Sequence, residues 1–207
     1  FHGADNVTAL VSDSSISNAL SSHIKQFGNA DKVEIINTNP RAFLNNIQFS
    51  YDVILIAPRN SFRPIKSGTY SLLEEGVITV EAIQTYLDTL EENGILIFHS
   101  WTQTPTSEEF KILTTAVSAM EKNQLVDVNK KLVAIRTLQT MTFLVSKQDW
   151  TIDQILKIQA FTENLGIDIA YSPLVESGGT NRFAILNPEP YYPGIKSILD
   201  QENRKDF

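Results

Sequence analysis

Basic side chains follow the apolar run Tyr51–Ile56. Arg59, Arg63 and Lys66 lie in the irregular stretch directly after it. A guanidinium group presents forked N–H donors that match a carboxylate or a phosphate, so this cluster predicts a site for an anionic group. The alternative is that the three cations are solvated loop charges or partners of nearby glutamates.

Aromatic side chains could line the same site. Tyr70 lies further along this stretch, where it could stack on a flat ligand or simply cover the end of a sheet. His99 and Trp101 fall at the end of another apolar run, Gly94–Ser100. An imidazole gains or loses its charge near neutral pH, and an indole could form the far wall of a pocket. The structural alternative for His99 is a hydrogen bond to a neighbouring loop.

Other kinds of chemistry are not indicated. The three histidines lack H-x-x-x-H spacing, and zero cysteines exclude disulfides, thiolate metal ligands and cysteine nucleophiles in this chain. Ser14 and Ser15 have no G-x-S-x-G elbow around them and are typical of a helix N-terminus. Glu108 and Glu109 fall in the first turn of a predicted helix, where the helix dipole favours negative charge. We therefore do not interpret them as a catalytic pair.

Alternating strands and helices must position these residues. Parallel strands are predicted for the apolar runs Val7–Val11, Val33–Ile36, Tyr51–Ile56 and Gly94–Ser100. We expect Gly94–Ser100 to be buried and Tyr51–Ile56 to be covered on both faces. Helical periodicity separates these runs. Further predicted elements are an antiparallel hairpin of Leu132–Arg136 with Met141–Lys147, a helix ending at Gly166, a strand Asp168–Tyr171 and a helix Gly194–Gln201.

This order of elements predicts an α/β fold. We expect a doubly wound, Rossmann-like, mostly parallel sheet with an antiparallel C-terminal hairpin. In such sheets ligands bind beyond the carboxyl ends of the strands, which is where the stretches after Ile56 and Ser100 begin. We expect one domain over residues 1–207, with residues 167–207 as a possible appendage.

Composition narrows the classes of partner. With 207 residues, 42% hydrophobic and 20% charged, the chain matches ordinary soluble globular proteins. The net charge of −7 argues against nucleic acid. No apolar run reaches the ~18 residues that span a bilayer. The lack of cysteine fits a cytosolic fold, so we expect a cytoplasmic location, either as a separate protein or as the cytoplasmic domain of a membrane protein. The chain begins with Phe1 and not with Met, so we expect it to be a piece of a longer protein.

Several segments resemble a known family. In order and distance, VTALVSDSSIS, KVEIINTNPRAFL, YDVILIA and ITVEAIQTYLDTLEENGILIF resemble the second half of the spermidine synthase pattern within the S-adenosylmethionine-dependent methyltransferase fold. SFRPIKSGTYSL, WTQTPTSEEF, LVAIRTLQTMTFLVSK and NRFAILNPEPYY make the resemblance specific and extend it over nearly the whole chain. The chain looks most like spermidine-synthase-like domains of large bacterial proteins, often attached to membrane-spanning segments.

The resemblance implies a cofactor and three site positions. The cofactor would be S-adenosylmethionine or its decarboxylated form. Asp13 stands near the position of the acid that binds the ribose hydroxyls, and Asn39 matches the acid that contacts the adenine amine. Ala57 matches the catalytic aspartate, which orients the attacking amine and accepts charge. An alanine can do neither, which implies that polyamine synthesis by the usual route is lost.

The family's Gly-rich turn and first strand also have no counterpart here. The fold is therefore expected to lack its first strand, leaving a gap in the sheet, a direct pairing of its neighbours or completion by another chain, for example in a homodimer.

Three hypotheses for the function remain. The chain is a catalytically inactive, ligand-sensing or interaction module of a larger protein, with a small anionic or nucleoside ligand. Alternatively, it is an active transferase whose glycine-rich motif lies outside this chain. The third hypothesis is a purely structural assembly domain.

Overall fold

The computed structural model describes residues 3–26, 30–57, 76–103 and 105–200. The chain divides into two compact units, residues 1–48 and 49–207, and each is described by itself. The expectation of a single domain with a C-terminal appendage stays a prediction. Within the described ranges, no helix is both long enough and apolar enough to cross a membrane.

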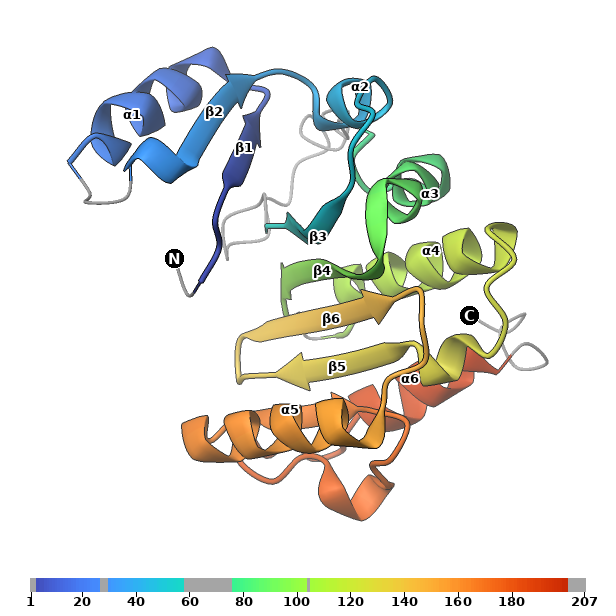
Figure 1. Cartoon of the computed structure of the whole chain (residues 1–207). Helices are drawn as coiled ribbons and strands as arrows, with labels where there is room; N and C mark the ends of the chain where they lie inside the picture. The colour runs from blue at the N-terminus through green and yellow to red at the C-terminus, as the bar shows by residue number, and fades with distance from the viewer. Residues whose placement is uncertain (1–2, 27–29, 58–75, 104, 201–207) are drawn as a thin grey trace. The chain divides into compact units, whose positions relative to one another are not determined.

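Unit 1 is a two-stranded parallel sheet with two helices (Figure 1). Strand β1 (Val7–Val11) pairs with β2 (Val33–Asn37), with Val7 opposite Val33. Helix α1 (Ser14–Ile24) follows β1, and the short helix α2 (Pro40–Leu44) follows β2 with its proline in the first turn. A proline is tolerated there because the first N–H groups of a helix have no intrahelical acceptor.

Unit 2 is built on a five-stranded sheet in the order β3-β4-β6-β5-β7. Strands β3 (Tyr51–Ile56) and β4 (Leu90–Trp101) are parallel, and the other three pairings are antiparallel. Strands β5 (Leu132–Arg136) and β6 (Thr140–Ser146) form the expected antiparallel hairpin. Strand β7 (Asp168–Tyr171) extends the sheet beyond β5. The mixed α/β fold is thereby confirmed.

Three helices pack behind the sheet as drawn in Figure 1 and one lies in front of it. Helices α3 (Val80–Thr89), α4 (Glu108–Lys122) and α6 (Tyr191–Leu199) belong to the rear layer, where α4 contacts both of the others. Helix α5 (Ile152–Leu165) lies in front and contacts β7. Thr151 and Gln154 form a capping box at its start, and Gly166 ends it with a φ of +65°.

The core lies between the sheet and the rear helices. Alternation along each strand turns Leu96, Phe98 and Phe143 to this side, and all three are at most 1% exposed. They meet the apolar stripe of α4, including Leu113 and Val117, which are completely buried. The stripe therefore fixes the position of the α4 N-terminus beside the end of β4.

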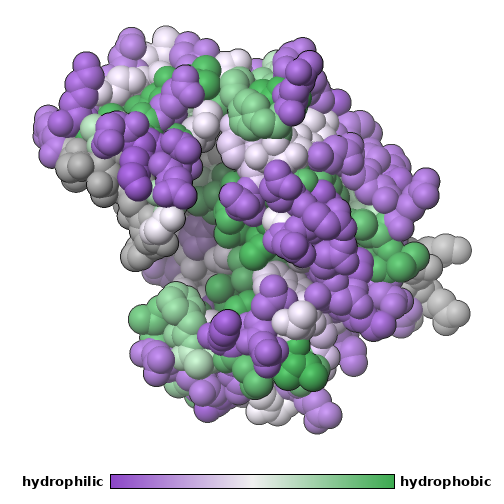
Figure 2. Space-filling model, in the orientation of Figure 1, coloured by the Kyte–Doolittle hydropathy of each residue, from purple (hydrophilic) through white to green (hydrophobic). Residues whose placement is uncertain are grey.

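The front face of the sheet is covered less completely. Val53 and Leu55 of β3 remain 52% and 61% exposed, whereas Ile54, which points to the rear, is buried. The expectation that Tyr51–Ile56 is covered on both faces is therefore wrong for the front face. Figure 2 shows apolar residues reaching the surface on this side of the molecule.

Two predicted elements differ from the structure by more than one residue at an end. The run Gly94–Ser100 is only the second half of β4, which starts at Leu90, because Leu90 pairs with Tyr51 ahead of a bulge. The last helix starts at Tyr191 and ends at Leu199. The Glu189 carboxylate accepts hydrogen bonds from the N–H groups of Tyr191 and Tyr192, which accounts for the earlier start.

Candidate functional site at the strand ends

In unit 1, two of the candidate side chains serve as helix caps. Asp13 Oδ1 accepts hydrogen bonds from the N–H groups of Ser15 at 2.7 Å and Ile16 at 3.0 Å. Asn39 Oδ1 accepts from Arg41 at 3.0 Å and Ala42 at 3.2 Å. Asp and Asn are favoured at such positions because their oxygens satisfy N–H groups that have no partner in the helix.

Parallel pairing brings these two caps to the same edge of the small sheet. Val11 lies opposite Asn37 at the ends of β1 and β2. The Asn37 side-chain amide and the Thr38 N–H both donate to the Val11 carbonyl, at 2.8 and 3.1 Å. Asp13 follows one strand and Asn39 the other, so unit 1 presents a carboxylate and an amide at one edge.

In unit 2, Ala57 directly follows β3 and is exposed. Its methyl side chain provides neither an acceptor for an amine nor a negative charge. The neighbouring candidates Arg59, Arg63 and Tyr70 lie outside the described residues. The arginine cluster therefore stays a prediction.

His99 and Trp101 lie near the end of β4 on the front face of the sheet. They alternate with buried Ser100, and both are half-buried. His99 Nδ1 is 2.7 Å from the hydroxyl oxygen of Thr142, which faces it on β6. The partner of His99 is therefore a strand residue and not the loop expected from the sequence. This hydrogen bond holds the imidazole by one nitrogen, as a structural contact would.

The acids at the start of α4 have structural partners. The carboxylate of Glu109 is completely buried and accepts hydrogen bonds from the Tyr191 hydroxyl at 3.0 Å and from the Gln103 N–H at 3.3 Å. Glu108 accepts one from the Gln103 side chain at 3.1 Å. Burial, and then the negative charge of Glu109, raise the pKa of Tyr191 well above its usual value. Tyr191 therefore stays protonated and donates to Glu109.

A buried ion pair was not anticipated from the sequence. Arg136, at the end of β5, and Asp168, at the start of β7, are each 1% exposed and are joined by a 3.2 Å contact from Nη2 to Oδ2. The same nitrogen also donates to the Ala184 carbonyl and the Asn181 side chain. The available signal was the position of each charge at the end of an apolar strand, where a charged residue needs a partner if it is buried.

The strand-end candidates therefore fall into separate groups. Asp13 and Asn39 share an edge in unit 1, and His99 and Trp101 share the front face of β4 in unit 2. Among the described residues, no cluster of histidine and acidic side chains could hold a metal ion.

Comparisons with known proteins give similarity at the level of structure. No family model matches the sequence, and no curated protein matches it. A crystal structure of a probable spermidine synthase from Corynebacterium glutamicum superposes with a TM-score of 0.53 and 17% identity, covering 76% of this chain and 53% of that chain. A spermidine synthase in complex with the transition-state analogue AdoDATO gives 0.51 and 18%, covering 94% and 62%.

These similarities show the fold. The chain has a divergent spermidine-synthase-like methyltransferase fold, as the sequence segments implied. It spans about half to three-fifths of the length of these two solved structures.

Proposed function

We propose that this chain is a spermidine-synthase-fold domain that does not transfer aminopropyl groups and that serves a larger protein as a ligand-binding or interaction module. The observation that carries the proposal is the exposed Ala57 at the end of β3. The amine that attacks the aminopropyl group must be held and deprotonated, and general base catalysis of this kind contributes about 10²–10⁴-fold to the rate.

The acids that follow the neighbouring strand β4 do not replace the missing carboxylate. Glu108 and Glu109, which follow β4, accept hydrogen bonds from Gln103 and, in the case of Glu109, also from Tyr191. Moving Glu109 toward a substrate would leave the buried Tyr191 hydroxyl without its acceptor, which costs about 1–3 kcal/mol. These acids therefore support the structure and do not serve as a base.

The described residues fit S-adenosylmethionine only in part. Asp13 is exposed and has a second carboxylate oxygen besides the one that caps α1, so it offers an acceptor for ribose hydroxyls. The Asn39 oxygen already accepts two backbone hydrogen bonds, which leaves it poorly placed to accept one from an adenine amine.

A transferase assay and a binding assay test the proposal together. The whole chain, and the longer protein that contains it, should form no spermidine from putrescine and decarboxylated S-adenosylmethionine above the level of a no-enzyme blank. Measurable spermidine formation would contradict the proposal. A rise in melting temperature with methylthioadenosine would show that a nucleoside binds the native state and would favour an active transferase over the inactive module, because a ligand that binds only the native state stabilises it.

The second candidate, an active transferase completed by a glycine-rich motif outside this chain, is favoured by Asp13. An Asp13→Asn variant separates the two candidates in the longer protein. Asparagine caps a helix as well as aspartate does, so folding should be unchanged while the charge is removed. Loss of transferase activity in this variant would favour the active enzyme. If neither the unaltered protein nor the Asp13→Asn variant is active and both bind the ligand equally, the inactive binding module is favoured.

A further inference from the structure

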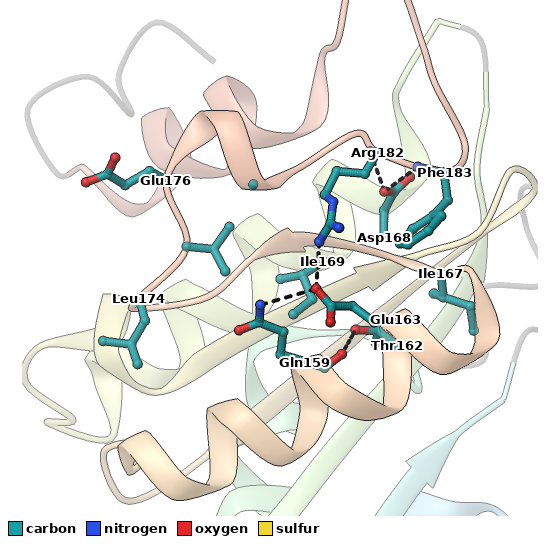
Figure 3. Close-up of a pocket in the computed structure, with 12 residues that line it drawn as sticks. Gln159, Thr162, Glu163, Ile167, Asp168, Ile169, Leu174, Glu176, Arg182 and Phe183 are labelled. Carbon is teal, nitrogen blue, oxygen red and sulfur yellow. Dashed lines mark hydrogen bonds and ion pairs between the residues drawn. The ribbon is translucent and has the colours of Figure 1, made fainter.

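A small cavity lies between α5 and the segment that follows β7, away from the strand ends of β3 and β4 (Figure 3). Its volume is about 270 Å³. Sites for drug-sized ligands have volumes of about 300–1,000 Å³, so this cavity fits a smaller compound. Gln159 and Glu163 of α5 line one side, and Leu174, Arg182 and Phe183 line the other.

The cavity wall is held in place without a ligand. The buried carboxylate of Asp168 accepts hydrogen bonds from three successive N–H groups, those of Arg182 at 2.6 Å, Phe183 at 2.9 Å and Ala184 at 2.8 Å. Behind it, Arg136 neutralises its charge. Because this segment is already ordered, a ligand would not have to supply the free energy that orders it.

Opposite charges meet at the cavity. Arg182 Nη1 donates to Glu163 Oε1 at 2.7 Å, and the two side chains are 49% and 42% exposed. The hydrogen bond from Arg182 lowers the pKa of Glu163, so Glu163 is ionised at neutral pH. Within the described chain, Glu163 Oε2 and the Arg182 nitrogens Nε and Nη2 have no other hydrogen-bond partner. An exposed ion pair contributes little to stability, so its two members are available to a ligand.

Apolar side chains complete the cavity. Leu174 is 51% exposed and Phe183 is 44% exposed, and the Arg182 guanidinium lies 5.3 Å from the centre of the Phe183 ring. Figure 3 shows Arg182 and Glu163 pointing toward one another across the gap, with Leu174 further along the cavity and Glu176 directed away from it. The Glu163 carboxylate, the Arg182 guanidinium group and an apolar wall therefore share a small volume.

We propose that this cavity binds an aliphatic α-amino acid, with the ligand carboxylate on Arg182, its ammonium group on Glu163 and its side chain against Leu174. The carboxylate matches the forked donors of a guanidinium group. The ammonium group matches the second Glu163 oxygen. The site is independent of the strand ends, so it can exist whether or not the chain is a transferase.

The test uses the whole ¹⁵N-labelled chain titrated with L-leucine and followed by NMR. We expect saturable shifts of the Gln159, Glu163 and Arg182 amides with a Kd on the order of 1 mM. Two fragments of the ligand provide the internal comparison. 4-Methylpentanoate lacks the ammonium group and 3-methylbutylamine lacks the carboxylate, and each should bind at least about ten-fold more weakly than L-leucine.

Variants locate the site. Arg182→Gln and Glu163→Gln should each weaken L-leucine binding at least about ten-fold, because each removes the charge opposite one end of the ligand. Lys157→Gln, on the same helix but outside the cavity lining, removes a charge as a matched control and should leave binding unchanged. Absence of saturable shifts at 20-fold the expected Kd would overturn the proposal. So would equal binding of L-leucine and both fragments, or equal binding by all three variants.

Discussion

At the scale of single residues, the Arg136–Asp168 pair determines how the segment after β7 is ordered. Asp168 accepts three backbone N–H groups and faces a guanidinium group that is 1% exposed. A buried ion pair is not in itself strongly stabilising, but removing one member leaves the other charge uncompensated. The main effect of the pair on stability is therefore the free energy lost when one of its members is removed.

Asp168→Asn tests this role. The substitution keeps the size of the side chain but leaves Arg136 without a counter-charge, so we expect the free energy of unfolding to fall by about 3–5 kcal/mol. Urea denaturation followed by circular dichroism measures the change. The control is Glu163→Gln, which breaks an exposed pair and should leave the free energy of unfolding nearly unchanged. Similar losses in both variants would show that the buried pair has no special role.

At the scale of elements, the close packing of α6 against α4 depends on a glycine. An added Cβ at Gly194 would lie 2.5 Å from Cζ and 2.9 Å from Cε2 of Phe110. In the same region the Tyr191 ring packs edge-on against the Phe110 ring, with 5.8 Å between the two ring centroids. The helix therefore accepts a residue of low helix propensity so that the two helices can approach.

Gly194→Ala sets two effects against each other. Alanine favours a helix by about 1 kcal/mol over glycine, whereas overpacking a core costs about 1–3 kcal/mol. With Phe110 this close, we expect a net loss of about 1–2 kcal/mol in the free energy of unfolding. In a Phe110→Leu background the clash is smaller, so the same substitution should cost less or become stabilising. Equal effects in the two backgrounds, measured by urea unfolding, would refute the packing explanation.

At the scale of the whole molecule, the buried core belongs to unit 2. In the described part of unit 1, Leu44 is the only buried apolar side chain, and every residue of β1 is half-buried. In unit 2, both β5 and β6 contain completely buried side chains such as Val133 and Val145. Local stability follows buried apolar contact, so it should differ between the units.

Native-state hydrogen exchange measures this difference. In the whole chain we expect amides of β5 and β6 to exchange only through global unfolding. Amides of β1 and β2 should exchange at least about 10²-fold faster, through local opening of unit 1. Equal protection in the two sheets would mean that the units unfold as one.

The sequence predicted the fold better than the candidate site. Apolar periodicity identified β1, β2, β5 and β7 nearly to the residue, because burial on a sheet imposes a regular pattern on neighbouring positions. The bulge between Tyr51 and Val53 leaves no such pattern, and the start of β4 was missed for that reason.

Contacts between residues far apart in the sequence were the main features that the sequence did not predict. Asp168 lies far along the chain from its partner Arg136, and Arg182 lies far from its partner Glu163. No local pattern in the sequence indicates which charges form a pair. Asp13 and Asn39 were recognised through the family resemblance, and the structure adds that both are helix caps. A cap alone explains these residue types, so their identity does not distinguish a binding role from a structural one.

The outer strand β3 has a practical consequence for handling the protein. It lies at one end of the five-stranded sheet, with Val53 and Leu55 exposed, and neither lysine nor proline interrupts it. Natural sheets use such residues to discourage like strands from joining edge to edge. Concentrated stocks of the isolated chain should therefore lose material to precipitation during storage, and Leu55→Lys should slow this loss.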